Sequence, residues 1–235
     1  MPGEFKLDTW LAGILAELRS AFGERLLFAA HAGSWVRGEA GPSSDIDINV
    51  VLDEVRAGDI TAYRRIVDGL PFREKACGFI CGSEEMRAWP RHELFHFMNG
   101  CKVLHGSLDG IVEAPSRREV AEYLRINASG ILHYARHTLI YDRNLKASAE
   151  ALGGVYKSVF FILQAKLFLE TGIYVPTKKE VVRHLADKTD KEMFSTALEW
   201  AALPEGKRRS PEHYFEQLAV WSGGLLLFAE RQSRA

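Results

Sequence analysis

The sequence has little cysteine and almost no net charge. Its three cysteines, Cys77, Cys81 and Cys101, are too few and too odd in number for a disulfide framework, which suits a reducing compartment. We expect them to be small buried apolar residues. The formal net charge of −1 provides no basic field, so nucleic acid is a disfavoured partner.

Long hydrophobic runs are also missing. The longest apolar stretch, residues 158–170, is interrupted by Gln164 and Lys166 and is shorter than the ~18 residues that a membrane span needs. The first 22 residues lack the basic and apolar regions of a signal peptide and indicate an amphipathic helix. These features predict a cytoplasmic protein without a membrane partner, and they say nothing about its oligomeric state.

The periodicity of the apolar residues divides the chain in two. In the first half, strand-like runs at 25–32, 45–52 and 75–81 alternate with helical runs at 8–22 and 59–69, and Ser83 opens a short helix. After about residue 114 the strand signals end.

Helices alone are expected in the second half, near 116–141, 149–171, 190–202 and 211–231. Two capping boxes mark helix starts: Ser116 with Glu119 opens the first of these ranges, and Thr177 with Glu180 marks a further start before the helix near 190–202. We therefore predict an α+β protein with a small mixed sheet in residues 1–114 and an all-α bundle of four to five helices in residues 115–235.

The stretch DIDINVVL, residues 45–52, combines acids with an apolar face. Side chains alternate along a strand, so Ile46 and Ile48 would share the buried face while Asp45 and Asp47 leave the other. The apolar face specifies the register, because a slip by one residue would bury the acids. Two carboxylates held on the same side repel each other unless a cation lies between them, and oxygen ligands of this kind suit Mg²⁺.

A Gly-Ser pair precedes these acids at the end of the preceding strand. Gly33 allows backbone to approach a ligand closely, and Ser34 offers a hydroxyl. The amides that follow could begin a helix whose N-terminus attracts phosphate. A phosphate cradle opposite a metal-binding strand is the arrangement that metal-assisted transfer of a phosphoryl or nucleotidyl group requires.

The stretch GSWVRGEAGPSSDID resembles the signature of the DNA polymerase β-like nucleotidyltransferases. The matching residues are Gly33, Ser34, Arg37, Gly38, Ser44, Asp45 and Asp47. CKVLHGSLD, residues 101–109, is similar to the end of the catalytic domain in antibiotic nucleotidyltransferases. QAKLFLETGIYVPTKKEVV resembles the helical domain of streptomycin/spectinomycin-type adenylyltransferases.

This resemblance implies a role for each matching residue. Asp45 and Asp47 would bind Mg²⁺ together with ATP, and Ser34, Ser44 and nearby amides would hold its phosphates. Arg37 is open to two interpretations, a phosphate contact or a solvated residue. In the helical domain, Lys166 and Lys178, with Lys179 as a close alternative, would contact the nucleotide, and the same domain would supply the site for the acceptor.

One position departs from the family. A third acidic residue, often the base for the attacking hydroxyl, is expected on a later strand, but the central positions there are Cys77, Gly78 and Phe79. Glu74, at the start of that strand, is the nearest candidate. Otherwise the base would come from the helical domain, or the enzyme would be impaired.

Three functions follow from these patterns. The first is a Mg²⁺-dependent nucleotidyltransferase that moves AMP from ATP to a hydroxyl of a small molecule, such as an antibiotic. The second is a non-catalytic nucleotide-binding or antitoxin-like relative. The third is a zinc hydrolase, because His92, Glu93 and His96 spell the His-Glu-x-x-His pattern of zinc-protease helices.

Overall fold

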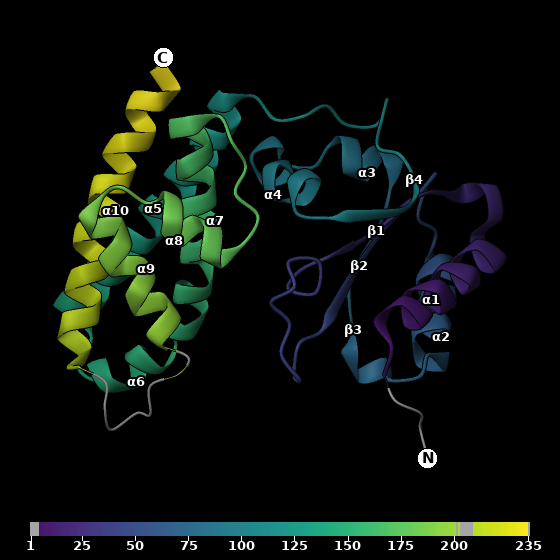
Figure 1. Ribbon diagram of the computed structural model, residues 1–235, viewed down its shortest axis with the longest axis horizontal. Coiled ribbons are helices and arrows are strands. Elements are labelled where there is room, and N and C mark those ends of the chain that lie inside the picture. Colours follow the sequence, from purple (N-terminus) through teal and green to yellow (C-terminus); the bar gives the residue numbers. More distant parts are fainter. Residues whose placement is uncertain (1–4, 201, 203–208, 235) are drawn as a thin grey trace. The chain divides into compact units, whose positions relative to one another are not determined.

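The computed structural model describes residues 5–200, 202 and 209–234. The chain divides into two compact units, unit 1 (Met1–Pro90 and His96–Ala114) and unit 2 (Arg91–Phe95 and Pro115–Ala235). Figure 1 shows strands and helices together in unit 1 and helices alone in unit 2, which confirms the predicted α+β fold class.

Unit 1 contains a four-stranded mixed sheet in the order β3-β2-β1-β4. β1 runs antiparallel to both β2 and β4, whereas β2 and β3 are parallel. The strands are β1 (Leu26–Ala32), β2 (Ile46–Leu52), β3 (Ala76–Gly82) and β4 (Lys102–Gly106). The helices of this region are α1 (Leu7–Phe22), η1 (Gly23–Arg25), α2 (Ala57–Gly69), η2 (Arg73–Lys75), α3 (Ser83–Arg87), η3 (Arg91–Glu93) and α4 (Leu94–Asn99). The sequence patterns do not predict β4, a short edge strand whose Val103 is 53% exposed.

The apolar face of β2 explains the register of the sheet. Ile46, Ile48, Val50 and Leu52 are all at most 1% exposed and belong to one core with α1 and α2, which Figure 1 shows on the same side of the strands. Burial of each such side chain contributes about 1.5–3 kcal/mol. The alternate residues of β2, Asp47 and Asn49, therefore lie on the opposite face.

β3 joins this sheet at a position that only glycine can occupy. Gly78 has φ +119°, and a Cβ built on it would lie 2.0 Å from the carbonyl oxygen of Ile48 on β2. Side chains larger than hydrogen would push the two strands apart. The close approach keeps the parallel register, in which Ile48 pairs with Gly78 and Asp47 pairs with Cys77.

Unit 2 is a helical bundle around one core. Its helices are α5 (Arg117–Tyr141), α6 (Leu145–Glu150), α7 (Leu152–Thr171), α8 (Lys178–His184), α9 (Lys188–Trp200) and α10 (Pro211–Arg234). α5 packs along α10 and also against α7, with Leu124, Leu163 and Phe215 fully buried. Both predicted capping boxes are confirmed, because Glu119 N donates to Ser116 Oγ and Glu180 N donates to Thr177 Oγ1.

α7 is the central helix of this unit. Among the described residues it is the one helix long and apolar enough to cross a membrane, yet 56% of that window is buried inside the structure, so its place in the core accounts for its apolarity. The single helix expected over 149–171 is two helices that meet at Ala151. Gly153 and Gly154 weaken helix formation beside this break.

The predicted boundary between residues 114 and 115 coincides with a boundary of the two units, but a short segment departs from it. Residues 91–95 belong to unit 2, because the ring of Phe95 lies 4.9 Å from that of Phe168 and Arg91 pairs with Glu119 at 3.0 Å. These contacts join positions 28 and 73 residues apart, so no local pattern in the sequence indicates them.

Candidate functional site

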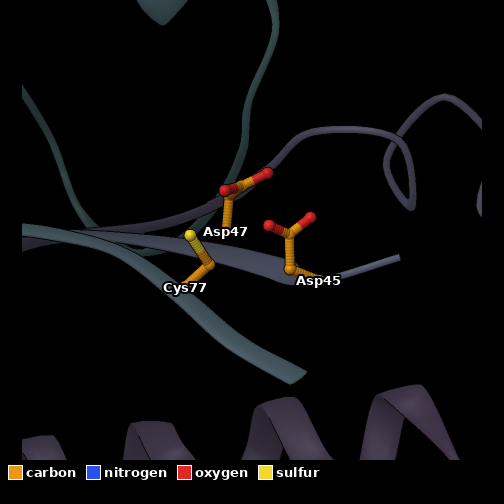
Figure 2. A group of neighbouring side chains, drawn as sticks. All are labelled: Asp45, Asp47 and Cys77. Carbon is orange, nitrogen blue, oxygen red and sulfur yellow. The ribbon is translucent and has the colours of Figure 1, made fainter. Parts of the chain in front are cut away.

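Two carboxylates leave the same face of β2. Asp45 immediately precedes the strand and is exposed, whereas Asp47 lies within it and is half-buried. Asp47 is opposite Ala32 on β1 and Cys77 on β3. Figure 2 shows the side chains of Asp45, Asp47 and Cys77 rising from one face of the sheet, with the sulfur of Cys77 beside the carboxylate of Asp47. The face predicted from the alternation is thus the face that the fold leaves free of α1.

The backbone at Gly33 contacts this carboxylate. Gly33 follows β1 directly and has φ +81°, and a Cβ built there would lie 2.1 Å from Oδ2 of Asp47. No side chain fits in that space, and L-residues also disfavour this φ. The position of Asp47 therefore requires glycine at residue 33. The sequence predicted a close approach of the Gly33 backbone to a ligand, and in the structure the group approached is a carboxylate of the protein itself.

Burial and like charge act together on Asp47. Its pKa is raised above the ordinary 3.8, first because the carboxyl group is partly removed from water and second because Asp45 is close; Arg37 and a hydrogen bond from the Cys77 thiol oppose the rise. A carboxylate whose ionised form is penalised in this way gains from a nearby cation. The donor set of two hard oxygens on a rigid strand therefore fits a divalent metal ion such as Mg²⁺.

The segment after Gly33 differs from the prediction. Residues 34–38 form consecutive turns and no helix begins there, so the expectation of a helix N-terminus at this point is wrong. The amide of Glu39 donates to the carbonyl oxygen of Ser34, and that of Gly38 donates to the carbonyl oxygen of Trp35. A phosphate cradle at this place would therefore consist of turn amides and the Ser34 hydroxyl.

Arg37 and Ser44 lie in the same loop between β1 and β2. Arg37 pairs with Glu39 at 3.1 Å, and both side chains are less than 20% exposed. It is also close enough to Asp47 to lower that residue's pKa. The Ser44 hydroxyl accepts a hydrogen bond from the amide of Gly41 at 2.9 Å, which closes the loop before Asp45. Phosphate contacts by Arg37 and Ser44 stay predictions.

The third side chain of the group is a cysteine. Ligand atoms of Asp45, Asp47 and Cys77 all lie within 4.8 Å of one another, and no other group of this kind is found in the described part of the chain. Cys77 is exposed, contrary to the expectation that the cysteines are buried, whereas Cys81 is buried as expected. Parallel pairing with Asp47 places Cys77 here. The missing carboxylate at this position was visible in the sequence, but the proximity of the thiol was not.

Glu74 does not join this group. It is an exposed residue in the 3₁₀ helix η2, which ends before β3 begins at Ala76. Its assignment as a base stays a prediction, and the geometry places the Cys77 thiol, not the Glu74 carboxylate, beside the acidic pair.

Lys166 and Lys178 both belong to unit 2. Lys166 lies within α7 with 11% of its side chain exposed, and its ammonium group pairs with Asp190, which also accepts from the indole N–H of Trp221 at 2.9 Å. This buried pair gives Lys166 a structural role. Lys178 is an exposed residue at the start of α8, as Lys179 is beside it. Nucleotide contacts by any of the three stay predictions.

The zinc-hydrolase pattern does not form one helix. His92 lies in the 3₁₀ helix η3, and His96 lies in α4, which begins at Leu94. A zinc-protease helix needs both imidazoles on one face of a continuous helix. Neither histidine belongs to the metal-capable group of the described residues. The fold therefore provides no basis for a zinc site at this motif.

Comparisons with known proteins agree with this geometry. Residues 11–87 match the family model of the nucleotidyltransferase domain. A crystal structure of spectinomycin adenyltransferase AAD(9) from Enterococcus faecialis, determined with ATP and spectinomycin, matches with a TM-score of 0.58 and 14% identity. The match covers 93% of this chain and 100% of the other, and at this identity it shows the fold alone. A search among curated proteins gave no match.

The family match spans β1, β2 and β3 together with the loop that carries Gly33 and both aspartates. The structural match extends the likeness over the helical part of the chain. Residues 11–87 are thus similar to a nucleotidyltransferase domain, and a mostly helical region follows them.

Proposed function

We propose that the protein is a Mg²⁺-dependent nucleotidyltransferase that moves AMP from ATP to a hydroxyl group of a small molecule. The observation that carries this proposal is the pair Asp45 and Asp47, directed to one side of β2 and adjoining the Gly33-Ser34 turn. The family match to a nucleotidyltransferase domain supports group transfer. The fold shared with an adenyltransferase determined with ATP and spectinomycin supports ATP and a small-molecule acceptor.

Different residues of unit 1 would bind the cation and the phosphate groups. Asp45 and Asp47 would hold the cation, and the absent Cβ of Gly33 leaves the carboxylate of Asp47 in place. The Ser34 hydroxyl and the amides of the following turn would donate to phosphate oxygens, while Arg37 would offset their charge. A bound divalent cation supplies charge neutralisation for the triphosphate and a lower pKa for the attacking hydroxyl.

The test is pyrophosphate release from labelled ATP with Mg²⁺ and a panel of hydroxylated acceptors, including aminocyclitols. Asp45→Asn and Asp47→Asn keep the size of each side chain and remove its charge. Both should lower the rate by at least about 10²-fold, because each removes a ligand of the cation. A wild-type protein that neither releases pyrophosphate nor binds Mg²⁺-ATP through these aspartates would contradict the proposal.

A second candidate function is a non-catalytic nucleotide-binding protein. The specific observation in its favour is the cysteine beside the two aspartates, where the family places a third carboxylate. Isothermal titration with Mg²⁺-ATP, combined with the pyrophosphate assay, separates the two functions. Binding that depends on Asp47, without pyrophosphate release for any acceptor, would favour the second.

A further inference from the structure

Cys77 is a side chain at the site to which the proposed transfer gives no role. Its thiol donates a hydrogen bond to the carboxylate of Asp47, and its side chain is exposed. The other two cysteines are buried or partly buried and lie outside the group of Asp45, Asp47 and Cys77. Cys77 thus differs from them both in its access to solvent and in its neighbours.

The three ligand atoms are close enough to share one ion. A metal–sulfur bond of ~2.3 Å and a metal–oxygen bond of ~2.1 Å allow sulfur and oxygen on a common ion to lie up to about 4.4 Å apart. The atoms of Asp45, Asp47 and Cys77 lie within 4.8 Å of one another in a structure that contains no ion. A small rotation of the exposed side chains of Asp45 and Cys77 would close the difference.

The sheet holds these side chains in place. Asp47 and Cys77 are direct partners in the parallel ladder of β2 and β3, and Gly78 maintains that ladder because any Cβ would meet the carbonyl oxygen of Ile48. On the other side of Asp47, Gly33 leaves room for the carboxylate alone. Ligands on rigid strands need little reorganisation to bind a metal.

We propose that Cys77 is a third protein ligand of the cation held by Asp45 and Asp47, and that this site binds thiophilic divalent cations such as Zn²⁺, Co²⁺ and Cd²⁺ more tightly than Mg²⁺. A thiolate is a soft donor, which Mg²⁺ does not favour and these cations do. Binding replaces the thiol proton, which passes to water, and involves no oxidation or reduction. The inference rests on the proposed function only in taking the acidic pair as a cation site.

The experiment is a titration of the metal-free 235-residue chain with Cd²⁺, monitored by the ultraviolet sulfur-to-cadmium charge-transfer absorption. The wild type should show a saturable band with one equivalent. Cys77→Ser should lose it, and Cys101→Ser, which removes a thiol outside the site, should keep it. Asp47→Asn should keep the thiol but weaken Cd²⁺ binding at least about tenfold, because a ligand is lost.

A further variant, Cys77→Asp, converts the site to oxygen ligands alone. Thermal shifts should then show a stronger response to Mg²⁺ and a weaker one to Zn²⁺ than in the wild type. Cys77→Ala is the folding control. If it melts at the wild-type temperature and lacks the band, misfolding is not the reason for the loss of the band. A band that persists in Cys77→Ser, or Cd²⁺ binding that does not change in Asp47→Asn, would overturn the inference.

The metal titration and the pyrophosphate assay can fail separately, so they distinguish ligation by Cys77 from the proposed group transfer. If the wild type releases pyrophosphate with Mg²⁺ but shows no charge-transfer band, the proposed function stands and the ligation by Cys77 fails. If the band appears with the expected dependence on Cys77 and Asp47 but no acceptor supports pyrophosphate release, the ligation stands and the proposed transfer fails.

Discussion

Gly33 and Asp47 are in contact across the end of β1 and the start of β2: a Cβ on the glycine would lie 2.1 Å from Oδ2 of the aspartate. Gly33 and Asp47, two residues of the sequence signature, thus depend on each other sterically. The glycine gives the carboxylate its room, and the carboxylate is half-buried as a result.

Gly33→Ala should therefore disable the cation site without unfolding unit 1. The new methyl group displaces the Asp47 carboxylate, so we expect at least about tenfold weaker Mg²⁺-ATP binding by isothermal titration. Gly110→Ala is the matched control, because Gly110 has a similar φ of +75° but no heavy atom within 4 Å of a Cβ. Equal losses in the two variants would mean that backbone strain, not the contact with Asp47, is responsible.

Asp45→Asn should stabilise the metal-free protein while it weakens cation binding. The two carboxylates repel each other, and the charge of Asp45 contributes to the raised pKa of Asp47. Because Asp45 is exposed, we expect a gain of less than about 1 kcal/mol in the free energy of unfolding at pH 7. Urea unfolding with and without Mg²⁺ measures both effects. Loss of stability in the metal-free variant would contradict the repulsion.

Glu74→Gln and Cys77→Asp locate the base of the proposed transfer. A positioned general base contributes about 10²–10⁴-fold to a rate. Glu74 is exposed and outside the group of Asp45, Asp47 and Cys77, so its substitution should cost much less than this. Cys77→Asp puts a carboxylate beside Asp47 and should raise pyrophosphate release with Mg²⁺. A 10²-fold loss in Glu74→Gln would instead assign the base to Glu74.

Lys166→Met should lower the stability of unit 2. It leaves Asp190, whose side chain is 6% exposed, without its cation in the core, and unpaired buried charges of this kind cost about 3 kcal/mol. The double variant Lys166→Met/Asp190→Asn should lose less, because the stranded charge is gone and Trp221 keeps an acceptor. Thermal unfolding followed by tryptophan fluorescence measures both.

The same variant tests the predicted nucleotide contact of Lys166. Lys157→Met provides the comparison, since Lys157 is an exposed residue of the same helix, α7, and is not a predicted nucleotide contact. A weaker Mg²⁺-ATP affinity in Lys166→Met below its unfolding temperature, at unchanged stability, would support a nucleotide contact over the structural role.

His31 should make unit 1 less stable in mild acid. Its side chain is 2% exposed, and its pKa is lowered from 6.5, first by burial and then by the charge of Lys102. The unfolded chain therefore binds a proton at a pH where the folded one does not, so stability is full above pH 6.5 and falls below it, by at most about 1.4 kcal/mol per pH unit. His31→Gln should flatten the dependence of urea midpoints between about pH 6.5 and 5.5. An unchanged slope would remove His31 as its cause.

Much of the site was predictable because it depends on short-range geometry. Alternation along residues 45–52 placed Asp45 and Asp47 on one face, and the glycine at position 33 indicated a close approach. Capping boxes located the starts of α5 and α8 for the same reason, since each involves residues three apart.

Other features could not be predicted from local patterns. The membership of residues 91–95 in unit 2 depends on contacts with Glu119 and Phe168, which are distant in the sequence. Lys166 shows the difference clearly, because its pairing partner, Asp190, lies on another helix 24 residues away.

The sequence alone determined the two-part architecture and the acidic pair, because hydrophobic periodicity and side-chain alternation act between neighbours along the chain. Only the tertiary structure decided what completes the pair. The parallel register of β2 and β3, maintained by the close approach of Gly78 to Ile48, brings a thiol beside Asp47 from thirty positions further along. Such pairing depends on how strands meet in space, and no single segment of the sequence encodes it.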